Sequence, residues 1–185
     1  RALLSVAVAA GAGAWPVWAA AAMTRKPIPG SPSGESLPVI GIGTWQSFDV
    51  GPDALPGLAA ILTAFAEGGG TLIDSSPMYG KSESVAGELI QRANLRKKLF
   101  VATKVWTTGR EAGIAQMNDS LKKLNADPID LMQVHNLLDL DTHLATLADW
   151  KKAGRVRYVG ITHYTAGAYG SVEKALEKHA VDFLQ

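Results

Sequence analysis

The 185-residue chain contains no cysteine, which excludes disulfide bonds, thiolate metal ligands and cysteine nucleophiles. It also carries almost no net charge, because 18 lysines and arginines against 17 aspartates and glutamates give +1 at pH 7. A balance this close to neutral produces no general field that attracts nucleic acid or an anionic membrane. We therefore expect neither nucleic acid nor a membrane as a partner of the mature protein.

Two motifs are also missing from the chain. A Rossmann dinucleotide fingerprint needs three glycines in a G-x-G-x-x-G pattern, but Gly41-Ile42-Gly43 is followed by Gln46 where the third belongs. No H-x-H or similar cluster supplies the three or more ligands that catalytic metal sites use. His143 and His179 fall within predicted helices, where we expect solvated side chains. The sequence therefore predicts no metal site.

Residues 1–22 differ in composition from the rest of the chain. After Arg1 they are apolar or small, and Gly11, Gly13 and Pro16 make them a poor membrane helix. Their alanine-rich end suits signal-peptidase cleavage near residues 20–22. We expect the remnant of an export signal, with twin-arginine export as one route to a periplasmic location. The alternatives are a hydrophobic anchor and a cytoplasmic protein.

The chain from residue 23 onward divides into a linker and a regular alternation. Residues 23–36 contain three prolines and two glycines and predict an irregular linker. Beyond them, amphipathic segments at helical spacing alternate with short apolar runs. Strands are predicted at 37–45, 71–76, 99–106, 129–136 and 156–164, with a sixth beginning at 181–185, and helices at 56–67, 83–93, 110–125, 140–153 and 167–179.

Apolar strands separated by helices are typical of a parallel sheet covered by helices. The strand-end residues Asp74, Lys104, His135 and Thr162 are 30, 31 and 27 positions apart, about one βα unit each. Because the Rossmann fingerprint is missing, we favour an α/β fold of the (β/α)8 TIM-barrel type over residues 37–185. A closed barrel takes roughly 250 residues, so we expect five βα units and the start of strand six, in a C-terminally truncated chain.

Four polar residues are predicted to meet at one face of this barrel. Asp74, Lys104 and His135 each end an apolar strand, and Tyr79 lies in the loop after Asp74. The carboxyl ends of the strands converge in such a barrel, which is where active sites lie. A carboxylate at the end of a buried strand needs a cation, and Lys104 supplies it. We therefore expect the four side chains to surround one small volume.

The chemistry of these groups suits protonation of an oxygen. A phenol has an ordinary pKa near 10 and is a proton donor at neutral pH, and we expect the ammonium of Lys104 to lower the pKa of Tyr79. His135 can orient a carbonyl oxygen or relay a proton. None of the four can deliver hydride, so a nicotinamide cofactor would have to supply it.

Five stretches, VIGIGTWQ, IDSSPMYGKSE, VATKVW, IDLMQVHN and GRVRYVGIT, resemble in this order the aldo-keto reductases, which are (β/α)8-barrel carbonyl reductases that use NAD(P)H. The resemblance implies an NADP-dependent oxidoreductase that reduces an aldehyde or ketone to an alcohol. It implies that Tyr79 is the general acid, that Lys104 lowers its pKa, and that Asp74 pairs with Lys104. His135 then positions the substrate carbonyl.

The resemblance also implies contacts for cofactor and substrate. Cofactor contacts are expected from Thr44 and Trp45 and from Asp74 near the nicotinamide ribose. Trp45 and Trp106, with His135, are expected to line the substrate pocket. For the two tryptophans, packing in the core is the alternative.

The sequence departs from the family at the nicotinamide carboxamide. Where the family usually has Ser-Asn after the fifth strand, this chain has Thr162 and His163, and Gln185 is a further expected contact. Threonine keeps the hydroxyl, and histidine can still donate one hydrogen bond. The family's phosphate-binding segments come later than Gln185, so NADPH is implied by the family alone and NADH is the alternative.

Other functions stay open at this point. A barrel could keep dinucleotide binding without catalysis, as a regulatory or truncated protein. A Schiff-base aldolase could use Lys104, but it needs a neutral lysine, whereas Asp74 should keep this one charged. A metal-dependent hydrolase could draw on Asp74 and His135, yet lacks the other ligands. The substrate and the oligomeric state do not follow from the sequence.

Overall fold

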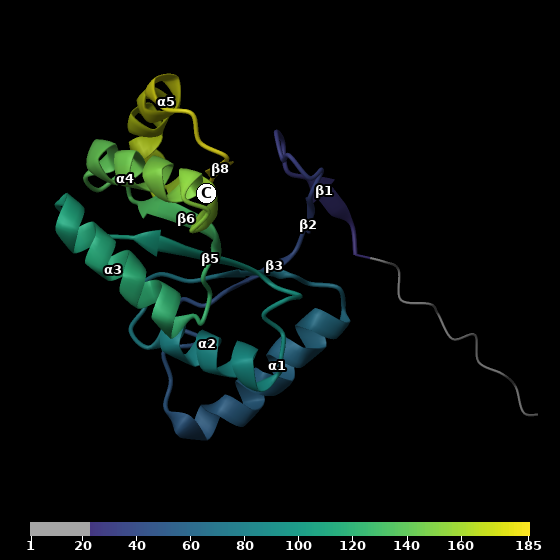
Figure 1. The fold of residues 1–185 in the computed structure, drawn as a ribbon. Coiled ribbons are helices and arrows are strands. Elements are labelled where there is room, and N and C mark those ends of the chain that lie inside the picture. Colours follow the sequence, from purple (N-terminus) through teal and green to yellow (C-terminus); the bar gives the residue numbers. More distant parts are fainter. Residues whose placement is uncertain (1–22) are drawn as a thin grey trace, which may run out of the picture.

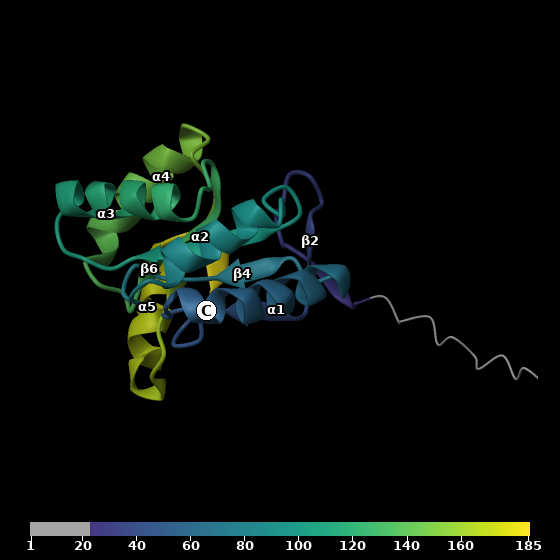
Figure 2. The same cartoon turned by 90° about the horizontal axis from the view of Figure 1, so that it is seen from below.

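The computed structural model describes residues 23–185 (Figures 1 and 2). The export signal predicted within residues 1–22 lies outside this range. Within residues 23–185, none of the helices has the length and apolar character needed to cross a membrane.

The core of the molecule is a six-stranded parallel sheet. Neighbours in the sheet follow the order of the chain, and each strand runs parallel to the next. Within residues 23–185 the first strand of the sheet, β3, and the last, β8, do not pair with each other, so the sheet is an open half-barrel. Its strands are β3 (Gly41–Gly43), β4 (Leu72–Asp74), β5 (Phe100–Val105), β6 (Ile129–His135), β7 (Val156–Thr162) and β8 (Phe183–Leu184).

Helices connect these strands and cover one face of the sheet. Helices α1 to α4 lie side by side in chain order, and α5 follows beyond α4 (Figures 1 and 2). The predicted fold of (β/α)8 type, with five βα units and the beginning of a sixth strand, is confirmed. The helices are α1 (Leu55–Glu67), α2 (Ser82–Arg92), α3 (Arg110–Lys123), α4 (Leu140–Lys152) and α5 (Tyr169–Lys178), with 3-10 turns η1 (Pro52–Ala54) and η2 (Ala166–Ala168) before α1 and α5.

Local sequence sets the ends of the first helix. Pro56 occupies the first turn of α1, where a missing N–H leaves no hydrogen bond unmade. The helix then stops at three glycines, of which Gly69 has φ 88°. A Cβ atom at Gly70 would lie 2.1 Å from the ring of Phe65, so this turn also requires a residue without a side chain.

The strands divide the core into two layers because successive side chains point to opposite faces. All residues of β5 and β6 are buried, which explains their nearly continuous apolar runs. One layer packs between the sheet and the helices and includes Leu62, Leu89, Met117, Met132 and Leu147. The other fills the inside of the half-barrel and includes Ile28, Phe100, Ala102, Leu131 and Tyr158. Burial of one large apolar side chain stabilises the fold by about 1.5–3 kcal/mol.

Residues 25–38 form a hairpin, so the irregular linker predicted for residues 23–36 is wrong. β1 (Arg25–Pro27) pairs antiparallel with β2 (Ser36–Pro38), and the first strand predicted at 37–45 is divided between β2 and β3. The reason lies in tertiary contacts. Ile28 is buried inside the half-barrel with Phe100 and Tyr158, near the amino-terminal ends of the strands. The hairpin therefore covers the end opposite to the predicted site.

Candidate active site

Asp74 and Lys104 form an ion pair at the carboxyl ends of β4 and β5. Lys104 Nζ lies 2.6 Å from Asp74 Oδ2 and donates a second hydrogen bond of 2.8 Å to the carbonyl oxygen of Ser75. The lysine side chain is only 1% exposed. Burial lowers the pKa of Lys104, while the charge and the hydrogen bond of Asp74 act in the opposite direction. The pair that the sequence predicted is therefore in contact.

Two glutamines complete the surroundings of the Asp74 carboxylate. Gln133 Nε2 donates to Asp74 Oδ1 and to Gln185 Oε1, and Gln185 Nε2 donates to Asp74 Oδ2, each at 3.3 Å. Gln185 was predicted as a cofactor contact, but Gln133 was missed. A signal was present, because Gln133 lies two residues before His135 on the same strand and so on the same face.

His135 ends β6 and is held by Ser76. Its Nδ1 lies 3.1 Å from Ser76 Oγ, which also accepts the N–H of Met78 at 3.3 Å. Burial, with the positive charge of Lys104 and then of His163, lowers the pKa of His135 to about 4. The ring is therefore neutral at pH 7. Since Ser76 Oγ accepts from Met78, its own hydrogen can go to Nδ1, which leaves the His135 Nε2–H as a donor.

Tyr79 lies between His135 and the ion pair. Its ring meets the ring of His135 edge-on, with centroids 5.9 Å apart, and Lys104 Nζ lies 5.3 Å from the phenol ring centroid. The predicted lowering of the Tyr79 pKa is wrong in direction. Burial raises the pKa of Tyr79, and the negative charge of Asp74 acts in the same direction, since both disfavour the phenolate. The phenol is therefore held in its protonated form.

The residues after β3 lie next to this group. The N–H of Thr44 donates to the carbonyl oxygen of Asp74 at 3.0 Å, and its hydroxyl donates to Ser75 Oγ at 2.9 Å. Thr44 is fully buried, so it fixes the strand end. Trp45 is 64% exposed and its ring centroid lies 6.5 Å from that of Tyr79. Trp106 is 40% exposed, so neither tryptophan is packed in the core.

A cavity of about 440 Å³ opens over these side chains. None of its lining side chains is charged at neutral pH, because the His135 ring is neutral there, and indole and phenol rings dominate the wall. Met78, Asn136 and Tyr164 were missed, although each lies next to a predicted site residue along the chain. The lining consists of Trp45, Met78, Tyr79, Trp106, His135, Asn136 and Tyr164.

The three residues expected at the nicotinamide carboxamide lie together at the β7–β8 edge. The N–H of His163 donates to the carbonyl oxygen of Gln185 at 3.2 Å, and Thr162 is paired in register with His135. Of their side chains, the amide of Gln185 contacts the ion pair through Asp74, whereas Nδ1 of the His163 ring accepts the N–H of Thr165 at 3.3 Å. A hydroxyl, an imidazole and an amide offer both donors and acceptors, which is the chemistry that a nicotinamide carboxamide requires.

Two histidines outside the site differ in their surroundings. His143 was predicted to be solvated, but it is fully buried, with Nε2 2.7 Å from the carbonyl oxygen of Thr107. The sequence could not show this, because the ring fills the space over Gly113 of the neighbouring helix. His179 pairs with Asp141 at 2.7 Å. Among residues 23–185 no three His, Cys, Asp or Glu side chains gather as metal ligands would.

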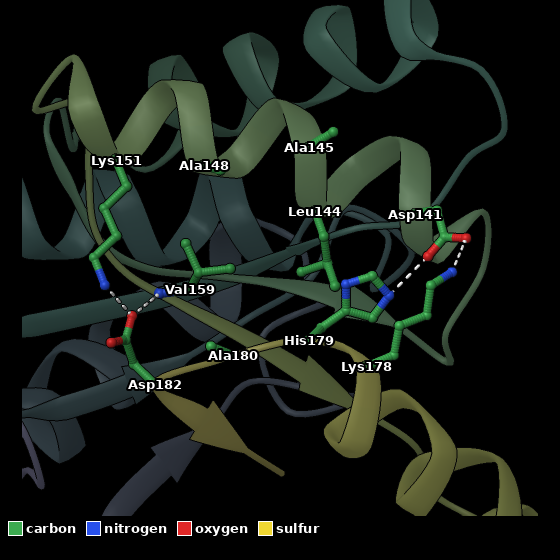
Figure 3. A pocket seen from close by; sticks show the side chains of 10 residues that line it. All are labelled: Asp141, Leu144, Ala145, Ala148, Lys151, Val159, Lys178, His179, Ala180 and Asp182. Atoms are coloured by element: carbon green, nitrogen blue, oxygen red, sulfur yellow. Dashed lines mark hydrogen bonds and ion pairs between the residues drawn. The ribbon is translucent and has the colours of Figure 1, made fainter.

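A second hollow, of about 390 Å³, lies on the helix side of the sheet between α4 and the segment after α5 (Figure 3). Its floor is apolar, and its charged side chains pair with one another. Lys178 and His179 contact Asp141, and Lys151 contacts Asp182. Because these charges are paired and the strand ends lie elsewhere, this hollow is not part of the candidate site.

Comparison with known proteins points to one family. Residues 39–185 match the Aldo/keto reductase family. Methylglyoxal reductase YeaE of Escherichia coli is 34% identical over 134 residues, which cover 69% of this chain and 46% of that protein. Aldo-keto reductase yakc of Schizosaccharomyces pombe, whose name includes NADP(+), is 29% identical over 169 residues, covering 82% and 49%. The chain thus spans about half the length of these relatives.

Solved structures agree with the sequence matches. The structure of an aldo/keto reductase from Brucella melitensis has a TM-score of 0.68 and 25% identity, covering 88% of this chain and 62% of that one. The likeness extends over the half-barrel, and the family match spans most of the chain. This chain therefore belongs to the aldo/keto reductase family.

Proposed function

We propose that this protein reduces a small aldehyde or ketone to an alcohol, with hydride from NADPH and a proton from Tyr79. The observation that carries the proposal is the position of the protonated phenol, which lines the cavity between neutral His135 and the Lys104–Asp74 pair. The names of the relatives support the same reaction class, since one is a methylglyoxal reductase and another is named for NADP(+). NADH is the alternative cofactor.

The cofactor is assigned to the edge of the sheet beside the ion pair. Thr162, His163 and Gln185 would contact the carboxamide, and Asp74 the ribose, with Thr44 and Trp45 on the other side. When bound, the nicotinamide would supply the hydride that no side chain of this site can provide.

The residues of the chain account for the movement of the proton. The Oη–H of Tyr79 would donate its proton to the carbonyl oxygen of the substrate, where negative charge develops during reduction. The His135 Nε2–H holds that oxygen, and the ammonium of Lys104 stabilises the phenolate that remains. Water then returns a proton to Tyr79. A positioned general acid contributes about 10²- to 10⁴-fold to a rate.

Replacement of Tyr79 by phenylalanine tests the proposal. Tyr79→Phe keeps the ring and removes only the acidic proton, so aldehyde-dependent NADPH oxidation should fall by at least about 10²-fold. The affinity for NADPH, followed by quenching of tryptophan fluorescence, should stay within about twofold. Unchanged turnover in this variant would refute the assignment of the proton donor.

The same assay separates the two other functions. A barrel that only binds the dinucleotide would bind NADPH but oxidise it with none of a panel of aldehydes and ketones. A Schiff-base aldolase would be trapped on Lys104 by borohydride in the presence of substrate. The contact of Lys104 Nζ with the Asp74 carboxylate favours the ammonium form and so argues against this second reaction.

Export of the protein, predicted from residues 1–22, stays a prediction. We propose that the chain crosses the membrane folded, with its cofactor bound. Fractionation of cells with sequencing of the mature amino terminus tests this. An uncleaved protein in the cytosol would contradict it.

A further inference from the structure

Glu83 is a buried carboxyl group that the proposed reaction does not use. It lies four residues after Tyr79, in the first turn of α2, and is 1% exposed. Its Oε1 accepts a 2.6 Å hydrogen bond from the Thr103 hydroxyl. Its Oε2 has no hydrogen-bond partner among the described residues, and neither has Ser120 Oγ on α3. A buried carboxyl group that is only half satisfied is unfavourable, so this position requires an explanation.

The surroundings of Glu83 leave little room for movement or for water. A Cβ atom at Gly87, one turn further along α2, would lie 1.9 Å from the carbonyl oxygen of Lys123, so α2 and α3 are in direct contact there. Burial raises the pKa of Glu83, and the nearby charge of Asp119 acts in the same direction. The hydrogen bond from Thr103 and the positive charge of Lys123 oppose this rise.

The Glu83–Thr103 hydrogen bond connects the two segments that carry the reacting groups. Thr103 directly precedes Lys104 on β5, and its side chain points to the helix layer while that of Lys104 points to the inside of the half-barrel. On the other side, the N–H of Ser82 donates to the carbonyl oxygen of Tyr79 at 3.1 Å, which joins the start of α2 to the tyrosine. The Glu83–Thr103 hydrogen bond thus ties the helix that follows the loop of the phenol to the strand of the ammonium.

On the basis of the proposed function, we propose that Glu83 is a positioning residue that holds Tyr79 over Lys104 through its hydrogen bond with Thr103. An apolar residue would fill the same space without fixing the distance between the loop and the strand. Lys104 Nζ lies 5.3 Å from the centroid of the Tyr79 ring, and the Glu83–Thr103 bond adds to the bonds of Ser75 with β5 in setting that separation.

Two matched pairs of variants test the proposal. Thr103→Val keeps the shape of the side chain and removes the donor, whereas Thr103→Ser keeps the donor. Glu83→Leu removes the acceptor, whereas Glu83→Gln keeps an acceptor for Thr103 and removes the charge. We expect kcat to fall about tenfold in Thr103→Val and Glu83→Leu and to stay within about threefold of wild type in Thr103→Ser and Glu83→Gln, which corresponds to 1.36 kcal/mol for each factor of ten.

The rates are expressed per NADPH-binding site, so that loss of folded protein does not count as loss of catalysis. KM and the affinity for NADPH should change by less than about twofold, and the solvent isotope effect on kcat should rise because proton transfer from Tyr79 slows. A purely structural role would lower the melting temperature and leave kcat per site unchanged. Loss of activity in Glu83→Gln with full activity in Thr103→Val would show that the charge acts, and would overturn the proposal.

A second measurement does not depend on activity. The chain has four tyrosines, and the ¹³Cζ signal of Tyr79 is assigned by its loss in Tyr79→Phe. We expect this signal to shift in Thr103→Val and to return in Thr103→Ser. If wild-type protein reduces no carbonyl compound, the proposed function fails, and this signal alone decides about the positioning role. If the Tyr79 signal in all four variants is identical to that of the wild-type protein, the positioning role of Glu83 is refuted.

Discussion

Gln116 on α3 makes both backbone hydrogen bonds of Trp106, at the wall of the candidate cavity. Its Oε1 accepts the N–H of Trp106 at 2.6 Å, and its Nε2 donates to the carbonyl oxygen at 3.1 Å. The loop after β5 is therefore fixed by one side chain.

Loss of this contact should weaken the binding of bulky substrates. We expect Gln116→Leu to raise KM for an aromatic aldehyde about three- to tenfold with little effect on kcat, because Trp106 is no longer held. Two lost hydrogen bonds should also lower the free energy of unfolding by about 1–3 kcal/mol. Gln91→Leu, at an exposed position of α2, is the matched control. If the two variants agree in KM and in urea denaturation, Gln116 does not fix the loop.

Removal of one partner of the buried Asp74–Lys104 pair should destabilise the fold more than removal of both charges. Lys104→Met leaves a carboxylate without its cation, which is expected to lower the free energy of unfolding by about 3–5 kcal/mol. The double variant Lys104→Met, Asp74→Asn removes that carboxylate and should recover part of the loss. Urea denaturation of the two single variants and the double variant measures this coupling. If the change in unfolding free energy of the double variant equals the sum of the changes in the two single variants, Asp74 and Lys104 are not coupled.

The lowered pKa of His135 predicts how stability depends on pH. In the unfolded chain the imidazole binds its proton near its ordinary pKa of 6.5, and in the folded protein only near pH 4. The unfolded state therefore binds more protons between these values, so stability falls as the pH drops from 6.5 to 4 and is unaffected by this group above 6.5.

This loss should reach up to about 3 kcal/mol at pH 4. It is measured as the difference in unfolding free energy between wild type and His135→Asn at pH 7 and at pH 4, so that other titrating groups cancel. A difference that is the same at both pH values would show that the imidazole is not held neutral.

Gln133 should affect the cofactor rather than the proton donor. Gln133→Met removes the donor that holds Asp74 and Gln185 together while keeping the length of the side chain. We expect the dissociation constant for NADPH to rise about three- to tenfold, the value of one or two weak hydrogen bonds. Titration by fluorescence quenching measures it. An unchanged constant would remove Gln133 from the cofactor site.

The residues that line the site differ in how far sequence patterns reveal them. Asp74, Lys104 and His135 each follow an apolar strand, and parallel strands bring such ends together. Gln133 was hidden inside an apolar run, and Glu83 within a helix. Their roles depend on partners about 20 to 60 positions away, which no local pattern contains.

The hairpin of residues 25–38 shows the same limit for the fold. Its strands have three residues each, too few for a period to appear, and two of those residues are prolines. Ile28 is buried because it packs into the open end of the half-barrel, which is a tertiary contact that no local pattern shows.

The sequence alone determined the order of strands and helices and the strand ends that carry polar side chains, because periodicity is a local property of the chain. Only the tertiary structure decided which of these side chains are in contact and in which protonation state each is held. For Tyr79 the rise in pKa follows from its partial burial beside Asp74, with Lys104 Nζ lying over the ring. Such distances are set by the packing of whole strands against one another, so they could not be derived from the order of residues.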